Sequence, residues 1–223
     1  ITGISSKLVP MFLLGKTTKE KLLHDACVLQ NIGLLLFIGD GYFFGINHFR
    51  VLIYAAIVIT GIVCWLMYLR DAFVHRVRKN IDVQMKHTFL SFLFLIIAVL
   101  LIPLILFTEN YRWAILYGML LFMGWITGII LGKTFKTLPF IVWNGHYKKL
   151  SGKVKVPLPK QLYNEALVTW QFRCFIAAIF LLAVCILLNE IIIIRIAAAL
   201  WLIVASLYVF NVMKTLLHKT TIL

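Results

Sequence analysis

Six long apolar runs constrain this chain more than any other feature of its sequence. Each approaches the roughly 20 residues that a helix needs to cross a bilayer, and each is continuously apolar rather than alternating. Only a helix satisfies every backbone group within one such segment. The sequence therefore predicts an all-α, polytopic transmembrane bundle of six complete helices, preceded by an N-terminal stub at Ile1–Leu14. The six runs are Asp25–Phe44, Val51–Leu69, Thr88–Phe107, Trp113–Gly132, Thr169–Leu188 and Ile192–Phe210.

The composition excludes water-soluble classes of protein. Of the 223 residues, 62% are hydrophobic and 13% are charged, which is more apolar surface than a soluble core of this size can bury. The net charge of +14 does not indicate nucleic acid, because the basic residues lie between apolar runs and form no basic face with stacking aromatics. The four cysteines show no Cys-x-x-Cys spacing, so neither a disulfide framework nor a zinc site is predicted. The expected partner is the lipid bilayer.

The distribution of lysine and arginine predicts the orientation of the chain. Three arginines, Arg50, Arg112 and Arg195, fall on one side of the six runs, and eighteen basic residues fall on the other. The positive-inside rule places the basic side and the C-terminus in the cytoplasm. We expect a multi-pass protein of the cell membrane. The eighteen are Lys7, Lys16, Lys19, Lys21, Arg70, Arg76, Arg78, Lys79, Lys86, Lys133, Lys136, Lys148, Lys149, Lys153, Lys155, Lys160, Lys214 and Lys219.

Two features within the runs predict helix geometry. Gly124, Gly128 and Gly132 recur every four residues in the fourth run, which gives a flat stripe that a neighbouring helix can approach closely. Pro103 removes one hydrogen bond from the outer part of the third run, so we expect a kink there.

A motif occurs twice in the chain, at residues 3–12 and 132–141. Its pattern is G-x-[ST]-x-K-x-h-P, where h is apolar, and it is formed by Gly3, Lys7 and Pro10 in one copy and by Gly132, Lys136 and Pro139 in the other. Both copies are expected to end a membrane helix on the basic side. Four helices separate them, which favours duplication of a four-helix unit. The alternative is a recurrent helix-stop signal, in which lysine reaches the headgroups and proline ends the helix.

The second copy carries a family resemblance. Gly124-Trp125, followed by Gly132, Lys136 and Pro139, resembles the heme-copper oxidase subunit I superfamily, and within it the NnrS-like and oxidase-like bacterial membrane proteins. The resemblance implies a bundle built from four-helix arcs, a location in the bacterial inner membrane, and a role in heme, metal or nitric-oxide-related redox processes. It also implies respiratory or other membrane subunits as partners.

The histidine ligands expected from that family are absent at the corresponding positions. Tyr117 and Met119 stand where a His-x-His pair precedes the Gly-Trp pair in family members that bind heme or copper. All six histidines are expected in loops or at helix ends, so no metal site is predicted in this chain. Heme or copper would be held only through residues upstream of Ile1. Because the sequence begins with Ile and shows no signal peptide, we expect a single transmembrane domain over 1–223 that belongs to a longer chain.

Four polar side chains within the runs are candidates for an intramembrane site. Asp40 is flanked by glycines in the outer part of the first run, and Gln30 and Asn31 lie about three turns deeper. Intramembrane polar groups usually face a cavity or a partner, so these three would line a proton or ion path. Alternatively, the helix ends near Asp40, which then caps it in the headgroups. Arg195 near the outer end of the last run is explained by snorkelling or by pairing with an acid.

Three hypotheses about function follow. The first is a helical scaffold in an oxidase-like or NnrS-like protein, without metal ligands of its own in this region. The second is a small-molecule or ion transporter, because internal repeats and glycine-interrupted helices also occur in transporters. The third is a non-catalytic accessory subunit that packs into a membrane complex. Motifs of soluble enzymes are absent from the sequence. Their absence leaves open whether the intact protein is an enzyme.

Overall fold

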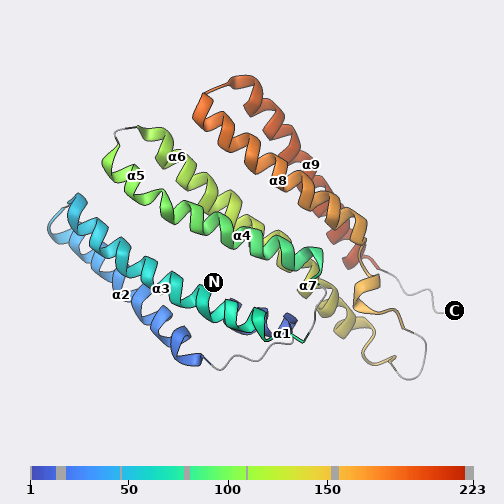
Figure 1. Cartoon of the computed structure of the whole chain (residues 1–223). Helices are drawn as coiled ribbons and strands as arrows, with labels where there is room; N and C mark the ends of the chain where they lie inside the picture. The colour runs from blue at the N-terminus through green and yellow to red at the C-terminus, as the bar shows by residue number, and fades with distance from the viewer. Residues whose placement is uncertain are drawn as a thin grey trace. The chain divides into compact units, whose positions relative to one another are not determined.

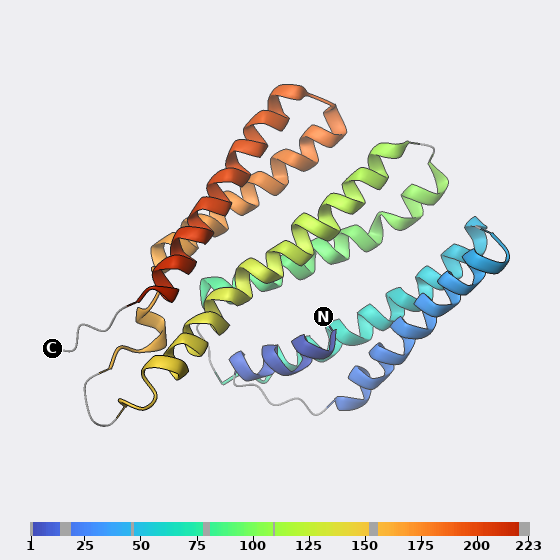
Figure 2. The ribbon, with the colours of Figure 1, turned by 180° about the vertical axis from the view of Figure 1, so that it is seen from behind.

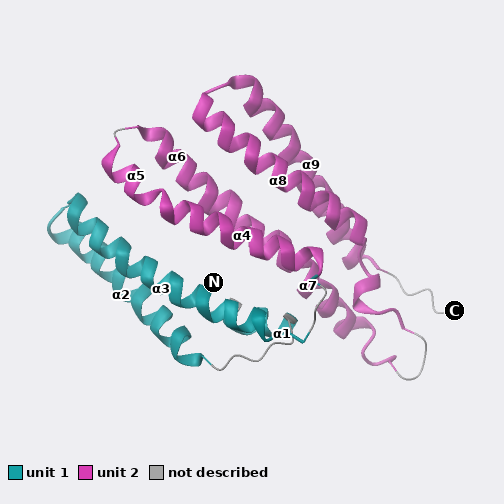
Figure 3. Ribbon diagram, viewed as in Figure 1, with its two compact units in different colours: residues 1–81 teal, residues 82–223 magenta. Residues whose placement is uncertain are grey.

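The computed structural model describes residues 2–13, 19–45, 47–77, 81–108, 110–151 and 156–218. Within these ranges the chain is helical and contains no strand, so the predicted all-α class is confirmed. The helices form two compact units, Ile1–Ile81 and Asp82–Leu223 (Figure 3). Each unit is described by itself below, and the prediction of a single transmembrane domain stays a prediction.

Unit 1 is a helix pair with a short helix packed against it. The pair consists of α2 (Glu20–Phe43) and α3 (His48–Val74), which run antiparallel side by side (Figure 1). Close approach is possible because a Cβ added at Gly33 would lie 3.2 Å from Tyr54 O, and one added at Gly61 would lie 3.1 Å from Ala26 O. The short helix α1 (Thr2–Leu13) packs mainly against α3.

Unit 2 contains the remaining helices. The first segment, α4 (Val83–Leu100), is followed after Leu101 by α5 (Ile102–Phe107), so the helix is interrupted next to Pro103 as predicted. A continuous helical segment comprises α6 (Tyr111–Met119), the π-helical turn η1 (Leu120–Ile126) and α7 (Thr127–His146). After the short 3-10 turn η2 (Pro159–Gln161), α8 (Glu165–Leu188) and α9 (Ile191–Leu216) form an antiparallel pair, seen from behind in Figure 2.

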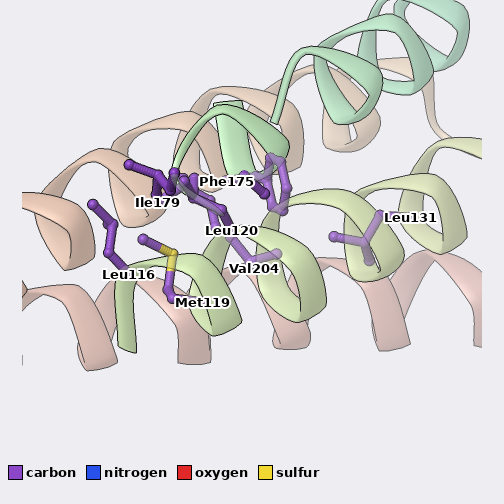
Figure 4. Packing of buried hydrophobic residues seen from close by; sticks show 9 residues of the cluster. Leu116, Met119, Leu120, Leu131, Phe175, Ile179 and Val204 are labelled. Atoms are coloured by element: carbon purple, nitrogen blue, oxygen red, sulfur yellow. The ribbon is translucent and has the colours of Figure 1, made fainter. Parts of the chain in front are cut away.

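An apolar core joins the helices of unit 2. Leu116, Met119 and Leu120 from the α6–η1 segment meet Phe175 and Ile179 of α8 (Figure 4). All five are at most 7% exposed. Lipid tails are as apolar as these side chains, so close packing, rather than removal from water, holds the α6–α7 segment against α8 in this layer.

Six helices of the described chain are long and apolar enough to cross a membrane, which agrees with the six predicted runs. They span Glu20–Phe43, His48–Val74, Val83–Phe107, Tyr111–His146, Glu165–Leu188 and Ile191–Leu216. Their outer surfaces carry large apolar side chains, such as Phe180 and Leu202, that are 66% and 70% exposed. So much exposed apolar surface is typical of a protein that faces lipid.

The prediction that the motif ends a helix is wrong for the second copy, whereas α1, which carries the first copy, ends at Leu13, directly after it. The fourth predicted run was expected to end at Gly132, but the helix continues to His146 with Pro139 buried inside it. Likewise, Pro10 lies inside α1. The lysine that resembled a stop signal, Lys136, pairs with Asp82 of the same unit. The charge of Lys136 is therefore met by a carboxylate of the protein, and lysine itself favours a continuing helix.

Candidate functional site

The predicted glycine stripe lies against helix α4. A Cβ added at Gly124 would lie 3.0 Å from Phe94 Cβ, and one added at Gly128 would overlap Ser91 Oγ. At Gly132 the added Cβ would meet Gln84 O at 3.0 Å and Thr88 Oγ1 at 3.1 Å. The three glycines therefore let η1 and α7 approach α4 closely, and their neighbours on α4 become increasingly polar toward Gln84.

A polar stripe on α4 faces this contact. Gln84, His87, Thr88 and Ser91 repeat at the spacing of one helix face and are each at most 1% exposed. The hydroxyl groups of Thr88 and Ser91 donate within the helix, to Gln84 O at 3.0 Å and to His87 O at 2.9 Å. The Gln84 amide donates to the phenol oxygen of Tyr163 at 2.7 Å. The start of α4 is thus polar although its side chains on this face are buried.

Besides the indoles of Trp125 and Trp201, two side chains in this region have no hydrogen-bond partner among the described residues. They are His87, through both ring nitrogens, and Gln171 of α8, through both amide atoms. The His87 ring lies between aromatic neighbours on α8, 5.1 Å from the Phe172 ring and 4.5 Å from the Phe175 ring. Buried polar atoms are normally satisfied by protein or water, so His87 and Gln171 offer donors and acceptors to a small polar species.

Basic residues of α7 adjoin the polar stripe. Lys136 forms an ion pair with Asp82, and the two side chains are 13% and 15% exposed. Lys133 Nζ lies 3.8 Å from Met85 Sδ. Asp82 is the residue directly before α4, so the pair links the start of α4 to the middle of α7. Nowhere in the described ranges do three His, Cys, Asp or Glu side chains gather as a metal site would require.

The first motif copy has different surroundings. Gly3 would accept a Cβ with no atom within 4 Å, and the Lys7 side chain is exposed. The opposite face of α1 is buried through Ser6 and Val9, and the Tyr68 hydroxyl of α3 donates to Ser6 O at 3.1 Å. The structure therefore surrounds Gly132 and Lys136 with protein but leaves Gly3 and Lys7 open.

The other predicted polar residues make separate contacts. Gln30 Oε1 accepts a hydrogen bond from Thr2 Oγ1 at 2.9 Å, whereas Asn31 is exposed and donates to Cys27 O at 2.8 Å. Asp40 lies within α2, which continues to Phe43, and pairs with Arg50 Nε at 3.0 Å across the α2–α3 turn. Arg195 is exposed on α9.

Sequence analysis missed the most buried polar residues. The third run was expected to begin at Thr88, which placed His87 in a loop or at a helix end, whereas α4 begins at Val83 and buries His87 completely. A signal was available, because Gln84, His87, Thr88 and Ser91 follow helical spacing into an apolar run. No such pattern points to Gln171, because the nearby polar residues of α8, Thr169 and Arg173, are two positions away and do not repeat with it at helical spacing.

Comparison of the chain with protein-family profiles, curated proteins and solved structures finds no match. The resemblance to the heme-copper oxidase superfamily accordingly stays a prediction.

Proposed function

We propose that this chain is a helical scaffold of an oxidase-like or NnrS-like membrane protein that serves a heme, metal or nitric-oxide-related redox process. In this proposal it lies in the bacterial inner membrane with its basic loops and C-terminus in the cytoplasm. The observation that carries the proposal is the duplicated motif, because the helices that carry its two copies also precede similar helix pairs.

Each motif helix precedes an antiparallel helix pair and packs on the second helix of that pair. In unit 1, α1 precedes α2 and α3 and packs on α3; in unit 2, α7 precedes α8 and α9 and contacts α9. A tyrosine makes the contact in both cases. The Tyr68 hydroxyl donates a hydrogen bond to Ser6 O at 3.1 Å, and the Tyr208 hydroxyl lies 3.2 Å from Thr134 Oγ1. This similarity supports a repeating four-helix unit.

The chemistry of the site supports the scaffold assignment. His87 is a single imidazole packed between phenylalanine rings, and heme or copper sites need further ligands beside it. Any heme or copper of the intact protein is therefore proposed to use residues upstream of Ile1, with this region supporting their helices.

A reduced-minus-oxidised visible spectrum, combined with metal analysis, tests this function on the intact protein with its native N-terminus. We expect heme bands or stoichiometric copper. His87→Phe serves as the control and should leave both signals unchanged, because His87 is not a ligand in this proposal. A spectrum without bands and a metal-free protein would overturn the proposal, and loss of the signal in His87→Phe would overturn the assignment of this region as scaffold.

The unpaired atoms of His87 and Gln171 favour a second candidate, passage of protons or a small polar solute through unit 2. Polar groups inside a membrane bundle often mark such paths. Asp40 is not proposed to line this path, because its carboxylate pairs with Arg50. In proteoliposomes, Gln171→Leu should lower the flux of protons or solute while Asp40→Asn preserves it. Equal flux in both variants and the parent protein would remove this candidate.

A further inference from the structure

The two motif copies differ in what contacts them. In unit 2, Gly132 and Lys136 of α7 are both covered by α4: the glycine meets its backbone, and the lysine pairs with Asp82 at its start. In unit 1, a Cβ at the corresponding Gly3 would meet no atom within 4 Å, and the Lys7 side chain is exposed. One copy is therefore complete, and the other presents the same two residues without a covering helix.

The open residues of α1 lie on one face of the helix. Gly3, Lys7 and Met11 are spaced by four residues, which places them in one row along an α-helix. The other face is already used by unit 1, where Ser6 and Val9 are buried. Met11 is 56% exposed, so no part of unit 1 covers this row. We call Gly3, Lys7 and Met11 the open face of α1.

We infer that the open face of α1 docks a transmembrane helix from outside these 223 residues, and that this helix begins with a carboxylate on the basic side of the membrane. The inference rests on the repeat and on charge complementarity: α4 begins with Asp82, which pairs with Lys136. A glycine allows the two backbones to approach, and a lysine one turn away favours an acid over apolar lipid. This inference does not depend on a redox role.

The acids that begin α4 and α8, on the basic side of unit 2, are already paired. Asp82 pairs with Lys136, and Glu165 at the start of α8 pairs with Lys160 at 3.0 Å. The covering helix is therefore expected to bring its own carboxylate, held close to Lys7 as Asp82 is held close to Lys136.

Photo-crosslinking in native membranes tests this inference on the intact protein. A photoreactive amino acid is placed at Met11, and the matched control position is Met67, which is 48% exposed on α3. We expect an adduct from position 11 only, with a peptide that carries Asp or Glu at the start of a transmembrane helix. Lys7→Glu should lower the adduct yield about fivefold, the factor that corresponds to an ion pair of about 1 kcal/mol, and Lys7→Arg should preserve it.

A second variant separates docking from folding. Gly3→Leu adds bulk where unit 1 has no atom within 4 Å, so it should leave unit 1 folded while it lowers the adduct yield. Charge exchange, with Lys7→Glu and lysine at the acid found in the adduct, should restore the yield. The inference is overturned by a yield no higher than at Met67, by an adduct peptide without an acid or from within this chain, or by a yield that Lys7→Glu leaves unchanged.

Discussion

Replacing Gly132 by alanine adds one methyl group at a point of close contact between α7 and α4. The new Cβ would lie 3.0 Å from Gln84 O, 3.1 Å from Thr88 Oγ1 and 3.3 Å from His87 Cβ. The carbonyl oxygen of Gln84 belongs to helical backbone and cannot rotate away, so the two helices must shift by a few tenths of an ångström. Such overpacking costs about 1–3 kcal/mol, and the higher helix propensity of alanine offsets about 1 kcal/mol. We expect a net loss of about 1 kcal/mol.

Gly118→Ala is the matched control, because a Cβ at Gly118 in α6 meets no atom within 4 Å. It should keep only the gain in helix propensity, up to about 1 kcal/mol. The two variants should therefore differ by about 2 kcal/mol, or about 30-fold in the unfolding equilibrium. The assay is reversible unfolding in mixed micelles of mild detergent and dodecyl sulfate, followed by circular dichroism. A Gly132→Ala protein as stable as Gly118→Ala would refute the close packing of α7 on α4.

Three further substitutions test polar contacts of unit 2 in the same titration. Asp82→Asn removes the counter-ion of Lys136 at a largely buried site and should lower the free energy of unfolding by about 2–3 kcal/mol. Lys136→Met in the Asp82→Asn protein should recover part of that loss. No recovery would contradict the pairing. Asn211→Ala removes two hydrogen bonds to the Asn164 backbone, of 2.8 and 3.0 Å, and should lower the free energy of unfolding by about 2–4 kcal/mol. An unchanged midpoint of the unfolding titration would show that these bonds do not hold α8 and α9 together. His87→Phe removes two unpaired buried nitrogens and should be neutral or stabilise by about 1 kcal/mol; a clear loss would show that the imidazole is hydrogen-bonded.

The six membrane helices could be predicted from the sequence because their signal is local. A run of apolar residues long enough to cross a bilayer has few alternatives to a helix. The interruption next to Pro103 was predictable for the same reason, because a missing backbone donor acts within one turn. The stripe of Gly124, Gly128 and Gly132 indicated a close helix contact, although the sequence did not identify α4 as the partner.

The candidate site depended on information that is not local. Lys136 resembles a residue that reaches the headgroups until Asp82, far away in sequence, is placed beside it. Asp40 resembled an intramembrane acid, because its partner Arg50 lies beyond the turn between α2 and α3. His87 lay at the edge of an apolar run, where one helical turn decides between solvent and core. Such pairings follow from tertiary packing, which periodicity along a single helix does not contain.

The central claim is that the chain crosses the membrane six times and holds its basic loops on one side. Single cysteines at Asn47, Asn189, Lys160 and His218, introduced after replacement of the native cysteines, test it with a membrane-impermeant maleimide on intact cells. The account predicts labelling at positions 47 and 189, and labelling at 160 and 218 only after the cells are opened. Labelling of positions 47 and 160 from the same side of the membrane would contradict it.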